Sequence, residues 1–471
     1  MLRRWKLDLK IDERLSQFPI YMQIAETIIG AIQSGMLKSG DFLPGSRKTA
    51  LLFNANRNTV IEAYHFLEHE GWVISKQRVG IFVADIPDHK QNNFSEKNIY
   101  NYAYENEENK LAFDQGLPDP FFSPVGELVR EYRSVLKRIQ KQKIAIYNHE
   151  AIGYKKLRIA LSQMLNQQRR IVSDENNICI TRGSQMALFL VSQCLLSEND
   201  CVIVEHPGYS LAWDTFKYAG ATVLFASVDQ DGILTSEIEK YIKEGNKIKA
   251  VYVCANGQFP TMAVLSNARR KRLIDLSNQY GFYIIEDDYC IDLNYTDKPI
   301  LPLCSTDNIM NYVYIETFSR SVSPILKMGY MVGSHDFIGK VARLRKMIDI
   351  SGDGIMERVF FNLIRDGIFT KCLKKSVVLY KAKRDFVDTV LQKYLKNKIT
   401  YQKPDLGLGY WIVPHKETVD YNLISKDLEL NGIKIISSDY YKFAGKGFFL
   451  SFGSAKEDKL EQGIKILAKF L

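Results

Sequence analysis

The chain has 471 residues, of which 46% are hydrophobic and 25% charged, and its 63 Lys+Arg against 54 Asp+Glu give a net charge of +9. This balance excludes a wholly disordered chain, a collagen-like chain and a disulfide-stapled miniprotein, and it permits nucleic-acid binding without arguing for it. The seven cysteines form no CxxC pair and the histidines show no metal spacing, so we expect no metal site. No apolar run reaches about 18 residues, so we expect a reduced, cytoplasmic protein with no membrane partner.

Composition changes abruptly at residues 86–110, which are polar, rich in Asn and poor in aliphatic side chains. Such a stretch cannot bury enough apolar surface to order itself, so we interpret it as a linker. It would separate a domain at 1–85 from a larger one at 111–471. The alternative is a long surface loop inside a single domain.

Residues 1–85 show the pattern of a small helical module with a wing. Apolar residues at helical spacing predict a helix over 19–35, a short second helix with Ser46 as its N-cap, and a third helix from Arg57 to the glycine at 71. Residues 72–85 alternate apolar and polar around Gly80, as a tight hairpin does. This order is that of a winged helix-turn-helix domain.

The third helix would enter the DNA major groove with its N-terminal end. An Arg side chain can fork onto guanine, an Asn onto adenine, and free backbone N–H groups face phosphate. Further cations at the head of the second helix and near the wing tip would contact phosphate or the minor groove. The candidate DNA-binding residues are Arg47, Asn56, Arg57, Asn58, Thr59, Lys76, Gln77 and Arg78. Periodicity alone leaves open a module that only packs, with Arg57 as a solvated charge.

Two motifs carry a resemblance for this module. Residues 37–47 read LxxGxxLPxxR and residues 57–71 read RxTVxxAYxxLxxEG. Over about 65 residues the segment resembles the DNA-binding domain of the GntR family of bacterial repressors, which implies DNA binding. The small residue usual before the recognition-helix Arg is Asn56 here, and the wing reads RVGIFV where GxGTFV is usual. These departures bear on which DNA sequence is read.

Beyond residue 111, apolar strands alternate with helical segments, for example a helix over 153–168, which predicts an α/β fold with a mostly parallel sheet. Polar groups follow several of these strands. The turn 182–185 would be an anion cradle at a helix N-terminus, and the acids of residues 286–288 end a buried strand where a doubly wound sheet places ligand groups. The alternatives are simple helix caps and solvated strand ends.

The order of these segments resembles the fold-type I aminotransferases that use pyridoxal phosphate. With the N-terminal module, the whole chain resembles the MocR/GabR subgroup of GntR regulators. The resemblance implies that Asp287 pairs with the pyridinium nitrogen, that Tyr209 stacks on the ring and that Tyr289 donates to the ring hydroxyl. The phosphate-binding residues that it implies are Ser184, Gln185, Thr317 and Ser319, and Tyr147 for the partner subunit's phosphate in a homodimer.

Three positions depart from that family at its charged groups. Its cofactor lysine closes a T/S-F-S-K motif, and this chain has Arg320 there. A guanidinium stays protonated and is no primary amine, so Arg320 cannot form the Schiff base; it could instead pair with an anion, or with Asp287 in a structural salt bridge. Lys327 replaces the phosphate-binding Arg, and Phe449 replaces the Arg that clamps a substrate carboxylate. A smaller change is Met262, where a PTG motif is usual.

We therefore expect a transcription regulator with no catalytic residues. As a homodimer it would bind paired half-sites on double-stranded DNA. Its aminotransferase-like domain would sense a small anionic ligand, with noncovalent pyridoxal phosphate as the first candidate, or would serve only as a dimerisation scaffold. The alternative from another class is a pyridoxal phosphate-dependent aminotransferase with a DNA-binding tether.

Overall fold

We describe the chain from a computed structural model. The residues described are 19–76, 79–85, 111–113, 116–119, 124–142, 150–306, 308–322, 326–416, 433–437 and 447–471. The chain divides into two compact units, Met1–Glu105 and Asn106–Leu471. The predicted linker 86–110 lies outside the described residues, so its boundaries stay a prediction. No helix in the described part is long and apolar enough to cross a bilayer.

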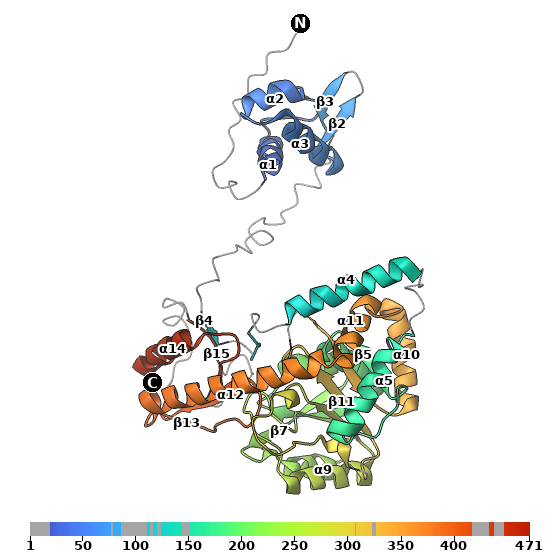
Figure 1. The fold of residues 1–471 in the computed structure, drawn as a ribbon, viewed down its shortest axis with the longest axis vertical. Coiled ribbons are helices and arrows are strands. Elements are labelled where there is room, and N and C mark those ends of the chain that lie inside the picture. Colours follow the sequence, from blue (N-terminus) through green and yellow to red (C-terminus); the bar gives the residue numbers. More distant parts are fainter. Residues whose placement is uncertain are drawn as a thin grey trace. The chain divides into compact units, whose positions relative to one another are not determined.

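The N-terminal unit has the predicted winged helix-turn-helix order (Figure 1). Its elements are α1 (Ile20–Gln33), β1 (Phe42–Leu43), α2 (Ser46–Leu52), α3 (Arg57–His69), β2 (Val73–Lys76) and β3 (Gly80–Val83). The three strands form a sheet in the order β1-β3-β2. Gly80 has φ +137°, and a Cβ at this position would collide with the Phe42 ring, so the hairpin requires glycine there.

The core of this unit forms because α1 and α3 turn their apolar stripes toward each other. Ile24, Val60 and Ala63 are fully buried there. Behind them the Tyr64 hydroxyl donates to the carbonyl of Pro44 at 2.5 Å. One local expectation was wrong by a residue: Ser46 is the first residue of α2 and Gly45 is its cap.

The C-terminal unit is built around a large sheet. Its strands are β5 (Ile178–Thr181), β6 (Cys201–His206), β7 (Thr222–Asp229), β8 (Gly232–Ile233), β9 (Ile248–Val253), β10 (Tyr283–Asp287), β11 (Tyr312–Thr317) and β12 (Gly329–Val332). They lie in the order β5-β12-β11-β10-β9-β6-β7-β8. Among these described strands all but β12 and β8 run in one direction, which confirms the predicted α/β fold with a mostly parallel sheet.

Helices cover both faces of this sheet, which is why its strands read as continuous apolar runs. One face packs against α6 (Ser184–Leu195), α7 (Ser210–Tyr218) and α10 (His335–Asp349). The other face packs against α5 (Lys155–Met164), α8 (Thr235–Lys243), α9 (Asn267–Tyr280) and α11 (Gly354–Arg365). Neighbouring residues of β10 show the alternation, since Ile284 enters the second layer and Ile285 the first. The helix expected over 153–168 is α5 followed by a π-helical turn, η5 (Leu165–Arg169).

A second, smaller sheet carries the C-terminal end of the chain. Its strands are β4 (Leu111–Phe113), β13 (Ile399–Tyr401), β14 (Gly409–Pro414), β15 (Ile433–Ser437) and β16 (Phe448–Ser451), in the order β13-β14-β16-β15-β4. It packs against α12 (Ile368–Leu395) and α14 (Glu457–Phe470). The remaining described elements are α4 (Val125–Gln142) and the short turns η6 (Ile291–Leu293) and η7 (Leu303–Ser305).

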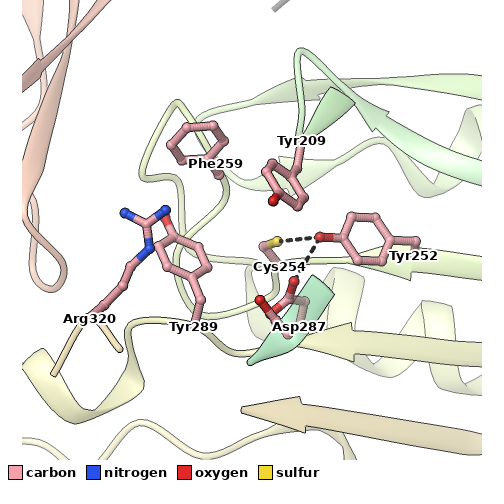
Figure 2. Close-up of a pocket in the computed structure, with 8 residues that line it drawn as sticks. Tyr209, Tyr252, Cys254, Phe259, Asp287, Tyr289 and Arg320 are labelled. Carbon is pink, nitrogen blue, oxygen red and sulfur yellow. Dashed lines mark hydrogen bonds between the residues drawn. The ribbon is translucent and has the colours of Figure 1, made fainter. Parts of the chain in front are cut away.

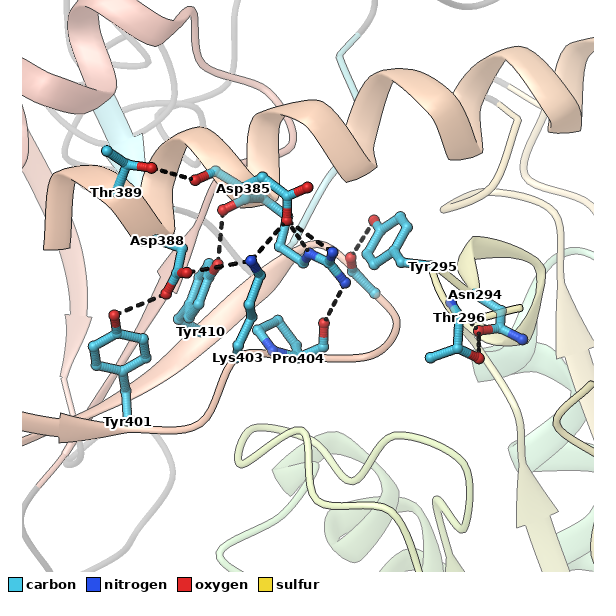
Figure 3. A network of polar contacts seen from close by, with 12 residues as sticks. Asn294, Tyr295, Thr296, Asp385, Asp388, Thr389, Tyr401, Lys403, Pro404 and Tyr410 are labelled. Carbon is cyan, nitrogen blue, oxygen red and sulfur yellow. Dashed lines mark hydrogen bonds and ion pairs between the residues drawn. The ribbon is translucent and has the colours of Figure 1, made fainter. Parts of the chain in front are cut away.

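Polar contacts attach the smaller sheet to α12 and to the loop after β10 (Figure 3). Lys403 bridges Asp385 at 2.9 Å and Asp388 at 3.2 Å on α12. The Arg384 guanidinium donates to the carbonyl of Pro404 at 3.2 Å and lies 5.0 Å from the centre of the Tyr295 ring. These contacts fix the position of β16, and therefore of Phe449, relative to the end of β10.

Candidate functional site

The site is a small cavity where the carboxyl ends of β9 and β10 meet the start of α6 (Figure 2). Its volume is about 40 Å³. A water needs roughly 10–15 Å³ measured in this way, so the cavity has room for a few waters and not for a substituted ring. The residues that line it are Ser184, Tyr209, Tyr252, Cys254, Phe259, Asp287, Tyr289 and Arg320.

Asp287 is the buried acid of this cavity, with 4% of its surface exposed. Its Oδ2 accepts a hydrogen bond from the Tyr252 hydroxyl at 3.0 Å. Its Oδ1 has no partner among the described residues. Burial raises the pKa of Asp287 to about 6, although the Tyr252 hydroxyl and the Arg320 charge work in the opposite direction. An unpartnered buried oxygen of this kind fits the N–H of a protonated ring nitrogen.

The other two acids of the 286–288 run have structural partners. Both carboxylate oxygens of Glu286 accept from the backbone N–H of Leu303 at 2.9 Å, which caps the turn η7. Asp288 accepts from the Asn256 side chain at 2.8 Å and from the Tyr314 hydroxyl at 3.3 Å. The capping interpretation therefore holds for Glu286, and of the three acids it is Asp287 that lines the cavity.

Tyr209 and Ser184 line the cavity from the α6 and α7 side, as the resemblance implied. Gln185 does not line it, because its amide is engaged beside α7. The Gln185 Nε2 donates to Thr215 at 2.9 Å, and its Oε1 accepts from the Tyr209 hydroxyl at 3.3 Å. Gln185 therefore positions Tyr209 in this structure.

The structure does not bring Thr317, Ser319 or Lys327 into this cavity. The Thr317 hydroxyl donates to the carbonyl of Met328 at 3.3 Å and lies 3.2 Å from the Ser319 hydroxyl. Lys327 is exposed and lines a separate cavity of about 120 Å³ with Arg182 and Arg345. Tyr147 lies outside the described residues. The roles of these side chains toward a phosphate stay predictions.

Arg320 stands at the position of the family's cofactor lysine. Its Nη1 donates to the carbonyl of Gly116 at 2.7 Å, and its guanidinium lies 5.1 Å from the centre of the Tyr289 ring. Figure 2 shows the guanidinium beside that ring. The suggested salt bridge with Asp287 is wrong, because Asp287 forms no ion pair among the described residues. The guanidinium has turned instead toward a backbone carbonyl and an aromatic face.

The position of the family's carboxylate-binding Arg is part of an apolar cluster. Phe449 is 2% exposed and packs on Phe259 with ring centres 5.5 Å apart. Met262 joins this cluster and has φ +62°, so the chain keeps a left-handed backbone where the family has glycine. The cluster consists of Phe259, Met262, Cys290, Leu406 and Phe449. Nothing in it can bind a carboxylate.

Sequence reasoning missed three of the lining residues: Tyr252, Cys254 and Phe259. Tyr252 faces Ile285 across the parallel pair β9–β10, two residues before Asp287. A tyrosine near the end of a mostly aliphatic strand was the available signal. Its meaning depended on the strand order, which periodicity does not give.

The N-terminal end of α3 presents polar side chains to solvent. Arg47, Arg57 and Asn58 are exposed. Asn56 is the cap of α3, because its Oδ1 accepts from the backbone N–H of Asn58 at 3.0 Å, and that oxygen is used within the fold. Arg57 donates through Nε to the Ser46 hydroxyl at 3.3 Å.

Thr59 lies on the first turn of α3 and is half-buried. On the wing, the Lys76 ammonium lies 5.3 Å from the centre of the Phe82 ring. Gln77 and Arg78 lie outside the described residues. The structure therefore brings most of the predicted DNA-binding residues to α2, the start of α3 and the wing, while their contacts with DNA stay predictions.

Comparison with known proteins matches each unit to a different family model. Residues 20–83 match the bacterial regulatory proteins of the gntR family, and residues 130–261 match the class-V aminotransferases. The aromatic-amino-acid aminotransferase 1 of Thermococcus litoralis is 28% identical over 370 residues, which is 76% of this chain and 87% of that protein. The HTH-type transcriptional regulator NorG of Staphylococcus aureus is 25% identical over 443 residues, which is 90% of this chain and 97% of that protein.

Solved structures resemble the C-terminal unit. A kynurenine aminotransferase of Pyrococcus horikoshii superposes with a TM-score of 0.72 at 25% identity, covering 82% of this chain and 98% of that one. An archaeal alanine:glyoxylate aminotransferase gives a TM-score of 0.71 at 25% identity, covering 76% and 90%. The C-terminal unit therefore has the fold of the aminotransferases, and the similarity to NorG spans both units.

Proposed function

Because the chain has the architecture of the MocR/GabR subgroup of GntR regulators, a GntR-type DNA-binding domain followed by an aminotransferase-like domain, we propose that it is a cytoplasmic transcription regulator. It binds an operator through α2, α3 and the wing. Its aminotransferase-like domain responds to a small ligand instead of catalysing a reaction. Relatives of both kinds, regulators and aminotransferases, support the two halves of this proposal.

The observation that carries the proposal is the exposed, cationic N-terminal end of α3 inside a GntR-type domain. Arg57 and Asn58 are exposed there, and no acidic residue stands in the first turn of the helix. The first backbone N–H groups of a helix and its dipole attract phosphate, and an exposed Arg can read guanine in the major groove. A helix that served only for packing would not need this arrangement.

The test is operator binding by an Arg57→Ala variant, measured by fluorescence anisotropy on the promoter region of the protein's own gene. We expect binding to weaken by about 1–3 kcal/mol, because a bidentate base contact is lost. Ser46→Ala is the matched control: it removes the hydrogen bond between Ser46 and Arg57 and keeps the guanidinium, so its affinity should stay near that of the wild type. Equal affinity of Arg57→Ala and wild type would show that the recognition helix is misassigned.

We infer that the domain does not catalyse transamination. A Schiff base needs a primary amine at the position of Arg320, and substrate binding needs a cation at the position of Phe449, which is part of an apolar cluster. Pyridoxal phosphate would therefore bind noncovalently. Asp287 would face its ring nitrogen, Tyr209 its ring and Ser184 its phosphate, and the group would offer an electron-poor ring with an anionic substituent. Calorimetric titration with pyridoxal phosphate tests this, since the absence of saturable heat would favour a ligand-free scaffold.

We also propose that the protein acts as a homodimer, so that two winged domains contact paired half-sites. An apolar stripe on α4 supports this. Leu128 and Ile139 of α4 pack on the hydrophobic core, while a second set of residues at helical spacing is exposed. That set consists of Val125, Val129, Tyr132 and Leu136, between 36% and 44% exposed. Sedimentation analysis of Leu136→Asp tests the assignment, and a dimer of unchanged affinity would exclude this stripe as its interface.

An aminotransferase with a DNA-binding tether remains the rival function, and the aminotransferase relatives favour it. The Arg320→Lys variant separates the two. In the regulator, this single change restores the amine, and a visible aldimine band with pyridoxal phosphate should appear in the variant and be absent from the wild type. A band of equal strength in both would support the enzyme.

A further inference from the structure

Residues 116–119, which we call the strap, contact Arg320, a side chain that lines the Asp287 cavity. The strap follows β4. In chain order, β4 is the first described element of the C-terminal unit after the unit Met1–Glu105. At its far end the backbone N–H of Asp119 donates to the Tyr380 hydroxyl at 2.9 Å, and the Asp119 carboxylate lies 3.4 Å from the Lys383 ammonium. Lys383 also donates to the carbonyls of Gly453 and Ala455 at 2.9 and 2.8 Å. This end of the strap is therefore anchored to α12 and the smaller sheet.

The near end of the strap is hydrogen-bonded to a side chain that lines the cavity. The Arg320 guanidinium donates to the carbonyl of Gly116 at 2.7 Å. Gly116 has φ +79°, and a Cβ there would lie 3.1 Å from the Arg320 Nη1 and 3.5 Å from the Phe449 ring. The same guanidinium lies 5.1 Å from the centre of the Tyr289 ring. One side chain thus touches both the ligand cavity and the segment that leads back toward the DNA-binding unit.

A ring-shaped ligand cannot enter this cavity without moving its wall. The cavity holds about 40 Å³, whereas an apolar cavity known to admit benzene measures roughly 150 Å³. Tyr252, Cys254 and Phe259 are almost fully buried in apolar clusters. Moving any of them would disrupt close packing in the core. Among the lining residues Arg320 is the long side chain that belongs to no apolar cluster, and it is half-buried.

Arg320 and Tyr289 also form the partition to a neighbouring cavity. Both residues line the Asp287 cavity and a second one of about 10 Å³ between Gly116, Met262 and Phe449. Displacing the Arg320–Tyr289 pair would join these spaces. A ring that pairs with Asp287 is planar, carries an N–H toward the Oδ1 that has no partner among the described residues, and needs no α-carboxylate because the far wall is apolar.

We propose that Arg320 is a latch that reports ligand binding to the strap. A planar ring with a protonated nitrogen pairs with Asp287 and displaces the guanidinium from Tyr289. The hydrogen bond from Arg320 to the Gly116 carbonyl is then lost, which loosens the near end of the strap. The effect of this release on operator affinity rests on the proposed function, whereas the release itself does not.

The experiment is hydrogen exchange by mass spectrometry on the full chain, followed at peptides covering residues 111–119, with pyridoxine as the probe. Pyridoxine has the ring nitrogen and lacks the aldehyde and the phosphate, so it can neither attach to lysine nor depend on a phosphate site. We expect it to bind with saturable heat and to raise deuterium uptake in these peptides at least twofold. Benzyl alcohol, a ring without the nitrogen, should leave uptake unchanged.

Arg320→Gln should show the raised uptake without ligand and no further rise with pyridoxine. Arg272→Gln is the matched control, because Arg272 is exposed on α9 and pairs with Glu239, far from the strap in the chain. If Arg320→Gln fails to fold by circular dichroism, Arg320→Lys takes its place, and we expect partial release because an ammonium lacks the planar fork.

Two results would overturn the latch: no saturable pyridoxine binding to the wild type, or binding that leaves uptake at 111–119 unchanged. Operator affinity is measured in the same samples. A wild type that binds no operator and still shows ligand-dependent uptake would reject the proposed function and keep the latch. A wild type that binds its operator and shows no ligand-dependent change in uptake would reject the latch and keep the proposed function.

Discussion

The Asp287 cavity and the smaller cavity beside it, which share Arg320 and Tyr289, have walls of opposite character. On the β10 wall a buried carboxylate keeps one oxygen without a partner, and its pKa is raised to about 6. On the β16 wall, Phe449 and Met262 pack into an apolar cluster at the positions where the family has an Arg and a glycine. One wall carries a buried acid whose Oδ1 has no partner among the described residues, and the other is packed like a hydrophobic core.

This contrast separates what the fold needs from what binding needs. Apolar packing on the β16 wall stabilises the fold, whereas an unpartnered buried oxygen costs about 1–3 kcal/mol. A group that destabilises the fold and faces a cavity is a candidate for ligand contact. The contrast therefore supports the proposal that the site binds a ring and does not bind an amino acid.

The largest expected effect is on the β16 wall. Phe449→Arg restores the residue type of the family but places a charge in an apolar cluster without a partner, which should lower the free energy of unfolding by about 3–5 kcal/mol. Phe449→Leu keeps an apolar side chain and should cost less than about 1.5 kcal/mol. Urea unfolding followed by circular dichroism measures both. A Phe449→Arg protein as stable as Phe449→Leu would mean that this wall still holds a hidden anion site.

The β10 wall should respond in the opposite direction. The pKa of Asp287 is raised from 3.8 to about 6, so its contribution to stability is complete below about pH 3.8 and is lost as the pH rises through 6. Asp287→Asn removes this loss, so the variant should be more stable than the wild type by about 1–3 kcal/mol at pH 8 and equal to it near pH 4.

Tyr252→Phe is the control for this comparison. It removes the hydroxyl that stabilises the carboxylate, so the pKa of Asp287 should rise further in the folded variant. The stability of the variant should therefore keep falling up to a higher pH than that of the wild type. Thermal unfolding between pH 4 and pH 8 gives all three profiles. An Asp287→Asn variant that is less stable than the wild type at pH 8 would show that the carboxylate is a structural group.

The smallest effect concerns the backbone at Met262. Its φ of +62° favours glycine over any other residue. Both Met262→Gly and Met262→Ala lose the packed side chain, but the glycine variant should be more stable than the alanine variant by about 0.4–1 kcal/mol. This reverses the usual order, and the midpoints of chemical unfolding measure it. The usual order, with alanine more stable, would indicate that the loop relaxes to another conformation.

Sequence reasoning was most successful where the evidence was local. The winged helix-turn-helix order and the alternation of strands and helices followed from periodicity and turn residues, and both are confirmed. The boundaries were less well predicted, as the cap of α2 and the π-helical end of α5 show. These depend on single hydrogen bonds that no apolar pattern encodes.

The site was predicted in part. The structure brings Asp287, Tyr209 and Arg320 around one cavity, while their roles toward a ligand stay predictions. The engagement of Gln185 by Thr215, the partition formed by Arg320 and Tyr289, and the packing of Met262 against Phe449 required three-dimensional neighbours. Strand order places these residues together, and sequence spacing does not state it.

The central claim is that a guanidinium occupies the place of the reactive amine, so the native protein reads DNA and does not form a covalent cofactor adduct. The most direct measurement is borohydride reduction of the wild type saturated with pyridoxal phosphate, followed by peptide mass spectrometry. We predict no stoichiometric pyridoxyl-lysine in the wild type and one at position 320 in Arg320→Lys. A stoichiometric adduct on any lysine of the wild type, accompanied by transamination of an amino acid, would contradict the account.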